Sequence, residues 1–353
     1  MSNRGHDTAL LATLAIVLAV SLAAAACLGA YGFSPGRLFD LVAQGARWKA
    51  ARDADAIDRD VLLTLRLPRV LAGALTGAIL GACGAVMQGL FRNPIVEPGL
   101  TGTSAGAAFG AALVFVFGVP VFAPGASWGL LALPVVAFAG ALCATLLTYR
   151  VAASFGRLHV FTLLLAGIAI NAACNAGSGL LSYFARDPQA RNITFWSLGT
   201  FTTASWSSVL IVALAAGVGW VGIAPDLKSL NALMLGEDEA LALGVDVRRL
   251  TRRLLVLCTM MVAAATATVG VIAFVGLVVP HALRLIRGSN HEFLVPASAL
   301  LGASFMLWVD VAARLVIRPG ELPIGVITAV VGAPVFLLLL LRAQRAATGS
   351  ADD

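Results

Sequence analysis

Gly102, Ser104 and Gly106 match the Gly-X-Ser-X-Gly pattern of a hydrolase nucleophile, and His281 could serve as its base. That pattern activates a serine only on a strained turn between a strand and a helix. Here it lies in an apolar run in which Gly102, Gly106 and Gly110 recur every four residues. Small residues at this spacing let membrane helices approach closely. We therefore expect helix packing at this motif, and no hydrolysis.

Other patterns that carry chemistry are missing from the sequence. There is no His-Glu-X-X-His stretch, and no glycine-rich loop ending in Gly-Lys-Ser or Gly-Lys-Thr that would cradle nucleotide phosphates. The five cysteines fall inside apolar runs without Cys-X-X-Cys spacing, so they predict neither disulfides nor a metal site. We expect a chain that is no enzyme and holds no metal or cofactor. If its transport is ATP-driven, a separate ATPase binds the ATP and Mg²⁺.

Polar side chains recur on one face of the apolar run 160–182. Asn171, Asn175 and Ser178 are spaced at i, i+4 and i+7. Asparagines that face lipid are costly, so this face points toward other helices or toward a transport pathway. Interhelical hydrogen bonding and pathway lining fit the spacing equally well, and we include the three residues among the candidate pathway residues.

Asp310 and Arg314 are spaced at i, i+4 near the end of another apolar run. On a helix this spacing brings the two side chains together. Charged residues inside a membrane span are usually paired, so we predict an ion pair that fixes the position of the arginine.

The composition identifies the class of protein that positions these residues. Of 353 residues, 59% are apolar and 12% are charged, whereas soluble domains average about 45–50% and about 25%. The mean hydropathy is +0.93. These values exclude a disordered chain, a nucleic-acid-binding protein and an ordinary soluble enzyme. The formal net charge of +6 fits arginines in loops that face lipid headgroups.

The apolar runs predict a single all-α membrane domain that spans residues 1–353. A bilayer core of about 30 Å needs roughly 20 apolar residues per helix, and the runs are too continuous for a β-barrel. The spans 253–275 and 275–287 adjoin each other, and Pro280 is the expected break in the stretch from Val269 to Leu285. We predict about ten transmembrane helices, at 9–30, 68–89, 97–118, 129–149, 160–182, 205–224, 253–275, 275–287, 293–316 and 323–342.

The placement of arginines favours cytoplasmic N- and C-termini. The first apolar run is longer than the core of a signal peptide, so we expect it to be retained. The segment 31–66 then forms the longest outer loop, in which mixed charges are typical of a solvated surface.

The inner segment 226–250 contains a short amphipathic stretch that opens with Glu237 and closes at Gly244. Acidic residues suit the first turn of a helix, and glycine suits its end. The apolar face of this stretch needs a cover, either the membrane surface or a partner. Its acidic start disfavours anionic lipid, so we favour a protein partner.

The turn from Arg92 to Gly99 is broken by two prolines. Irregular backbone at the membrane edge must be satisfied by protein or by a water-filled cavity. Glu97 is expected to lie at the positive N-terminal end of the following helix.

Several stretches, in this order along residues 65–335, resemble the permease subunits of type II ABC importers, the FecCD-like family that takes up iron-siderophores, heme and cobalamin. Each stretch is weak alone, but the ordered set is specific. They are Leu65-Arg-Leu-Pro-Arg69, Met87-Gln-Gly-Leu-Phe-Arg-Asn-Pro94, Glu97-Pro-Gly-Leu100, Ser104-Ala-Gly-Ala107, Leu235-Gly-Glu237, Gly276-Leu-Val-Val-Pro-His281 and Gly320-Glu-Leu-Pro-Ile-Gly325.

The resemblance implies a ten-helix permease bundle in the bacterial inner membrane. It implies a homodimer with the pathway between its copies, two ATP-binding cassette subunits inside and a periplasmic substrate-binding protein outside. It also implies that the inner segment is the coupling helix that contacts the ATPase, through Glu237, Ala240, Leu243 and Gly244.

The resemblance also implies site residues at both ends of the pathway. Arg66 and Arg314 match outer arginines that pair with carboxylates of the binding protein, and Arg69 and Arg318 are their neighbours. Asn93, with Ile95 beside it, matches the cytoplasmic gate. The other part of the gate falls near Val160 and Phe161, where the small hydroxyl residues of the cobalamin permease have no match.

Among the substrates of this family, the Gly-Leu-Phe-Arg-Asn-Pro stretch favours heme, followed by cobalamin and ferric siderophores. A different class, the ion-coupled secondary transporter, needs carboxylates or broken helices at the membrane midplane. Glu97 and Asp310 lie toward the ends of spans, which disfavours that alternative.

Overall fold

The computed structural model describes residues 2–29, 31–43, 53–118, 131–153, 160–317 and 320–349, and every regular element in them is helical. The all-α fold with about ten long helices is confirmed. Those helices are α1 (Ser2–Cys27), α4 (Leu67–Leu90), α5 (Thr103–Phe117), α7 (Ala132–Ala153), α8 (Val160–Phe184), α10 (Trp206–Ile223), α13 (Val247–Val269), α14 (Val275–Arg287), α15 (His291–Leu315) and α16 (Ile324–Gly349).

Shorter helical elements join the long ones. The short elements are α2 (Pro35–Ala43), α3 (Asp53–Asp60), a π-helical turn (Val61–Arg66), a 3-10 turn (Pro98–Thr101), α9 (Gln189–Ser197), a second 3-10 turn (Ala224–Asp226), α11 (Leu227–Leu233) and α12 (Glu237–Ala242).

The lengths and compositions of the helices indicate which of them can cross a bilayer. Seven of the described helices are long and apolar enough, and α5 and the part of α16 at Ile324–Leu338 are shorter apolar helices. The chain is therefore a multi-pass membrane protein.

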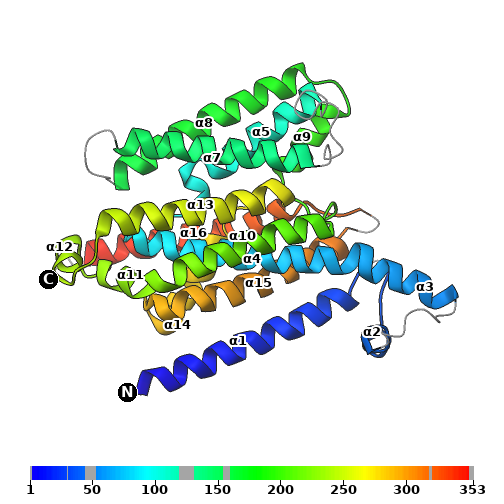
Figure 1. The fold of residues 1–353 in the computed structure, drawn as a ribbon, viewed down its shortest axis with the longest axis horizontal. Helices are drawn as coiled ribbons and strands as arrows, with labels where there is room; N and C mark the ends of the chain where they lie inside the picture. The colour runs from blue at the N-terminus through cyan, green and yellow to red at the C-terminus, as the bar shows by residue number, and fades with distance from the viewer. Residues whose placement is uncertain are drawn as a thin grey trace.

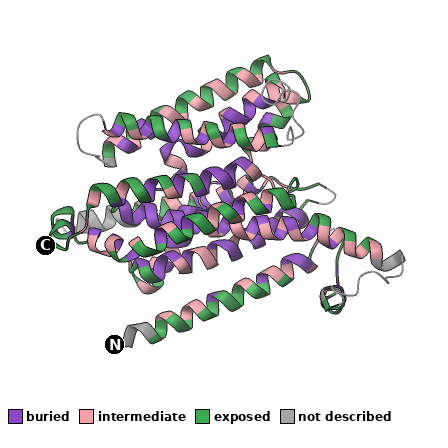
Figure 2. Ribbon diagram, in the orientation of Figure 1, coloured by how far each residue is buried: buried purple, intermediate pink, exposed green. Residues whose placement is uncertain are grey.

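Two groups of helices lie side by side in Figure 1. Helices α5, α7, α8 and α9 form one group next to α13, and α1 lies on the opposite side of the main bundle. Helix α4 runs through the middle of that bundle, and 78% of its most apolar window is buried, against 22% for α1. Figure 2 shows the same contrast between a buried centre and an exposed first helix. The chain passes from one group to the other between α4 and α5.

Glycines set the distance between the central helices. A Cβ atom at Gly77 of α4 would overlap the carbonyl oxygen of Gly302 of α15, and one at Gly106 of α5 would overlap that of Gly140 of α7. Side chains of any size would push these helices apart. Between lipid-exposed helices, close backbone packing replaces the hydrophobic effect as the stabilising force. The prediction that the glycine rows serve helix packing is confirmed.

Several predicted boundaries were wrong. The span 97–118 begins only at Thr103, because Pro98–Thr101 forms a 3-10 turn and Gly102 has a left-handed φ of 93°. The outer loop 31–66 is partly helical, and its last turn continues directly into α4. The span 253–275 instead begins at Val247 and ends at Val269, where Gly270 has φ 81°.

The expected break at Pro280 was wrong, because Pro280 lies inside α14. A proline inside a helix leaves the carbonyl four residues earlier without its N–H partner. That carbonyl belongs to Gly276, and Nε2 of Gln88 donates to it at 3.1 Å. A buried side chain of α4 thus satisfies the backbone group that Pro280 leaves free, and the helix continues.

Candidate functional site

Arg66 ends the π-helical turn that precedes α4. The N–H of Leu67 donates to the carbonyl of Leu62, five residues earlier, so the helix is wider here than a regular α-helix. Pro68 follows at once. It has no N–H and would crowd the preceding turn of a regular helix. The wider turn accommodates the proline within one continuous helix.

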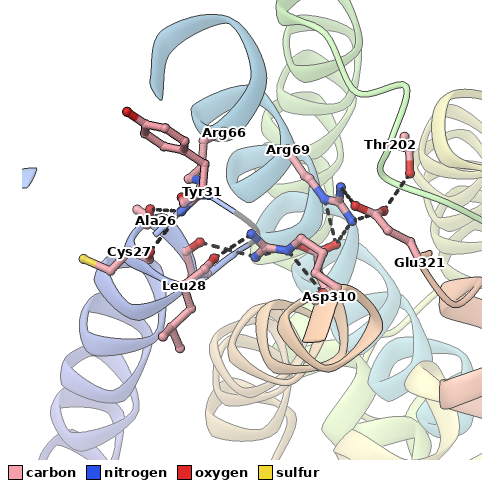
Figure 3. Close-up of polar contacts among 11 residues, drawn as sticks. Ala26, Cys27, Leu28, Tyr31, Arg66, Arg69, Thr202, Asp310 and Glu321 are labelled. Carbon is pink, nitrogen blue, oxygen red and sulfur yellow. Dashed lines mark hydrogen bonds and ion pairs between the residues drawn. The ribbon is translucent and has the colours of Figure 1, made fainter. Parts of the chain in front are cut away.

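The guanidinium of Arg66 closes the C-terminal end of α1, as Figure 3 shows. It donates to the carbonyl oxygens of Ala26 at 2.8 Å, Cys27 at 3.0 Å and Tyr31, and it lies over the ring of Phe33. The last carbonyls of a helix have no partner within the helix and carry partial negative charge. Arg66 is therefore a cap for α1 that is supplied by the π-helical turn before α4.

Arg314 of α15 supplies a second cap for the same helix end. Its Nη1 donates to the carbonyl oxygen of Leu28 at 2.8 Å, and its Nη2 donates to that of Ala25 at 3.3 Å. The same Nη2 lies 3.0 Å from Oδ2 of Asp310. The predicted i, i+4 ion pair between Asp310 and Arg314 is thus present.

Arg69 and two carboxylates complete this outer arginine cluster, which consists of Arg66, Arg69, Asp310, Arg314 and Glu321. Nε and Nη2 of Arg69 donate to Oδ1 of Asp310 at 2.9 and 2.8 Å. Nη1 and Nη2 of Arg69 donate to Glu321 at 3.0 and 2.9 Å. The cluster therefore joins α1, α4, α15 and the loop before α16 (Figure 3).

The burial of the cluster bears on the predicted docking residues. The side chains of Arg66 and Arg314 are both 7% exposed, and their donors are used by the end of α1. Arg69 is 13% exposed and Glu321 38%. The structure thus gives Arg66 and Arg314 a structural role, while their docking role stays a prediction. Arg318 lies outside the described residues.

In the predicted inner segment, α12 forms the expected short helix between two glycines. Gly236 precedes it with φ 144°, and Gly244 follows it with φ 83°, conformations that favour glycine. Ala240 is fully buried, whereas Glu237 is exposed. The predicted amphipathic helix is therefore present. The large apolar side chains that it and its flanks expose are Leu235, Leu241 and Leu243.

The inner segment is fixed to the bundle through Asn231 of α11. Oδ1 of Asn231 accepts from the backbone N–H of His291 at 2.8 Å and lies 2.9 Å from Nδ1 of the same histidine. Its Nδ2 donates to Oδ1 of Asn290 at 2.8 Å. Leu230 and Leu233 bury the other face of α11. The hydrogen bonds of Asn231 link α11 to the start of α15.

The predicted gate residues lie on two elements. Oδ1 of Asn93 accepts from the N–H of Ile95 at 3.0 Å, so the two residues shape one turn after α4, and both are half-buried. Val160 is the first residue of α8, and the next residue, Phe161, is 72% exposed. The gate role of these residues stays a prediction.

The polar stripe of α8 divides in the structure. Nδ2 of Asn171 donates to the carbonyl oxygens of Gly99 and Leu100, at 3.3 and 3.4 Å. Of the two roles that the spacing allowed, Asn171 therefore has the first, hydrogen bonding to a neighbouring element. Ser178 donates to Cys174 in its own helix, and Asn175 is exposed. The pathway role of Asn175 stays a prediction.

Sequence reasoning missed several residues of these sites. It paired Asp310 with Arg314 alone, and did not find the bonds of Arg69 to Asp310 and Glu321. A carboxylate in the middle of an apolar run is a signal for a second partner, but the sequence does not say which arginine. The hydrogen bond of Gln88 to the Gly276 carbonyl was also missed, because the only hint in the sequence is that Gln88 is a polar residue within an apolar run.

Comparison with known proteins agrees with this architecture. The model of the FecCD transport family matches residues 14–342. The hemin transport system permease protein HmuU of Yersinia pestis is 38% identical over 353 residues, which cover 99% of this chain and 100% of that protein. The vitamin B12 import system permease protein BtuC of Escherichia coli O9:H4 is 39% identical, with 94% of each chain covered.

Solved structures show the same fold. A metal-chelate type ABC transporter in an inward-facing conformation is 30% identical, with a TM-score of 0.80 that covers 95% of this chain and 99% of that one. PsaBC of Streptococcus pneumoniae, at 18% identity and a TM-score of 0.57, shares the fold alone. The chain is thus the permease of a metal-chelate type ABC importer. It belongs to the FecCD transport family.

Proposed function

We propose that this chain is the membrane permease of a heme importer, placed in the bacterial inner membrane with both termini in the cytoplasm. Two copies form the pathway, two ATP-binding cassette subunits bind inside, and a periplasmic binding protein delivers the substrate outside. The observation that supports heme is the full-length similarity to the hemin permease HmuU. Cobalamin is the second candidate, because permeases for vitamin B12 are 39% identical to this chain.

The exposed leucines of the inner segment support ATPase docking at Glu237, Leu243 and Gly244. Ala240, which is fully buried, packs α12 against the bundle beneath that surface. Large apolar side chains in a cytoplasmic loop are stabilised when a partner covers them. On the outer face, the three arginines of the cluster outnumber its two carboxylates. This excess of positive charge supports a docking site for an acidic surface of the binding protein. Arg318 would extend that site.

The substrate is tested by the ATPase activity of the reconstituted complex. The permease and its ATPase are placed in proteoliposomes with the cognate binding protein, loaded with hemin or with cyanocobalamin. We expect hemin to stimulate ATP hydrolysis and to accumulate inside. Stimulation by cyanocobalamin alone would contradict the heme assignment and retain the importer. Replacing Leu243 with Asp should reduce ATPase binding, and replacing the exposed Arg248 with Ala should not.

A further inference from the structure

Residues 91–102, here called the crossing segment, carry the chain from the main bundle to the group of α5, α7, α8 and α9 (Figure 1). On one side this segment supports α8. Asn171 of α8 donates to the carbonyl oxygens of Gly99 and Leu100. A Cβ atom at Gly167 of α8 would overlap the Leu100 carbonyl oxygen. Helix α8, which carries the candidate pathway residues, therefore packs directly on this backbone.

On its other side the crossing segment is fixed to α14 by Glu97. Oε1 of Glu97 accepts from the backbone N–H of Phe274 at 2.5 Å. Phe274 is the N-cap residue of α14 and has a left-handed φ of 69°. The first N–H groups of a helix have no partner within the helix, and a glutamate within the same helix often accepts from the N-cap N–H. Here a residue about 180 positions away does so, rather than capping the helix that follows it.

The same junction reaches two further elements. The ring of Phe274 packs against Gly332 of α16, where a Cβ atom would overlap it. On the inner side, Nη2 of Arg92 lies 3.7 Å from Oε1 of Glu237, at the start of the predicted coupling helix. That ion pair is exposed and contributes little by itself. It nevertheless places the crossing segment between the ATPase-facing surface and α8.

We propose that Glu97 is a positioning residue of the transport cycle, which locks the crossing segment to the first turn of α14 so that displacement of the inner face reaches α8. This inference rests on the proposed function. A displacement passes between distant sites when rigid elements between them move together. Asn231 of α11 binds Asn290 and His291, which closely follow α14 in the chain, so a displacement of the inner segment also reaches α14. Without the Glu97 bond, α14 would move while the crossing segment and α8 stayed behind. ATP hydrolysis would then continue with less transport.

The test measures hemin uptake and ATP hydrolysis together in proteoliposomes that hold the permease, its ATPase and the binding protein. Glu97→Ala removes the acceptor, Glu97→Gln keeps an acceptor oxygen, and Glu292→Ala changes an exposed carboxylate in the first turn of α15. We expect Glu97→Ala to lower the hemin transported per ATP about tenfold. Glu97→Gln and Glu292→Ala should stay within about twofold of the unmodified chain.

An unchanged ratio of hemin transported to ATP hydrolysed in the folded Glu97→Ala complex would overturn the proposal. If Glu97→Ala does not fold, Asn171→Ala, which frees α8 from the crossing segment, is measured instead. We expect it to lower the hemin transported per ATP to the same extent, and an unchanged ratio would overturn the proposal. Failure of the unmodified complex to import either hemin or cyanocobalamin with ATP would instead contradict the proposed function.

Discussion

Oδ1 of Asp310 lies 2.8 Å from Nη2 of Arg69, although the two residues are 241 positions apart in the chain. The same carboxylate binds Arg314, which caps the end of α1. One buried acid thus holds together the outer ends of three helices. The outer arginine cluster is therefore part of the fold as well as a candidate docking surface.

Replacing Asp310 with Asn should strongly destabilise the permease. The Asp310 side chain is 1% exposed, and removing one partner of a buried ion pair costs about 3–5 kcal/mol. Arg314 would lose the carboxylate that pairs with it, and Arg69 would keep only Glu321. Thermal unfolding in detergent should shift down by several degrees. Asp40→Asn, at an exposed carboxylate of α2, is the matched control. Equal midpoints for the two variants would show that the cluster does not hold the helices together.

Replacing Arg66 with Ala should free the end of α1. The lost hydrogen bonds involve a charged donor, and each contributes about 1.5–3 kcal/mol. Cys27, whose carbonyl oxygen accepts from Arg66, reports this opening through its rate of maleimide labelling. We expect a rise of about tenfold or more. Arg186→Ala, at an exposed residue on the same side, should leave the rate unchanged.

The same variants separate anchoring from docking. Charge reversal at Arg66 and Arg314 together should weaken affinity for the binding protein and spare membrane insertion. A variant that labels faster at Cys27 but binds the binding protein normally would assign these arginines to the fold alone. Unchanged affinity in the double variant would refute their docking role.

Replacing Gly77 with Ala should separate α4 from α15. The added methyl group overlaps the carbonyl oxygen of Gly302, and overpacking of this kind costs about 1–3 kcal/mol. Gly217 in α10 has open space around its Cβ position, so Gly217→Ala is a control that keeps or raises stability. The stability of the two variants is compared by the fraction of each protein that stays monodisperse after heating. Equal survival of the two variants would mean that α4 and α15 can move apart without loss.

Stability should fall at low pH through Glu321. Partial burial opposes ionisation of this carboxyl, but the hydrogen bond and charge of Arg69 outweigh it, so the pKa of Glu321 lies below its ordinary value of 4.5. A lowered pKa gives a contribution that is complete above pH 4.5 and is lost as the pH falls through the folded-state pKa. Glu321→Gln should therefore be less stable than the unmodified chain at pH 7. That difference should shrink as the pH falls below 4.5 and through the lowered pKa of Glu321. A constant difference across this range would contradict the assignment.

The sequence predicted features that depend on local spacing. Glycine rows predicted close helix packing, because a helix face without side chains allows close approach in any context, but they did not name α15 as the partner of α4. Glu237 and Gly244 predicted the ends of the short inner helix, since both act within one or two turns. The pair of Asp310 and Arg314 followed from their i, i+4 spacing.

Contacts between distant segments were beyond the sequence. Nothing near Glu97 indicates that its carboxylate caps α14 rather than the helix that follows it. The continuous helix through Pro280 depends on Gln88, which comes from another helix. The burial of Arg66 depends on where α1 ends. In each case the contact depends on a residue from a distant segment. A sequence motif identifies one residue of such a contact and does not identify the other.

The most direct test of the account is uptake of hemin into proteoliposomes that contain the permease with or without its ATPase. The binding protein, loaded with hemin, is added on the periplasmic side of the permease, and ATP is added on the side that holds the ATPase. We predict uptake only when the ATPase and ATP are both present, and no loss of uptake when ionophores collapse the ion gradients. Uphill uptake by the permease alone, or uptake that ionophores abolish, would contradict the account and indicate an ion-coupled secondary transporter.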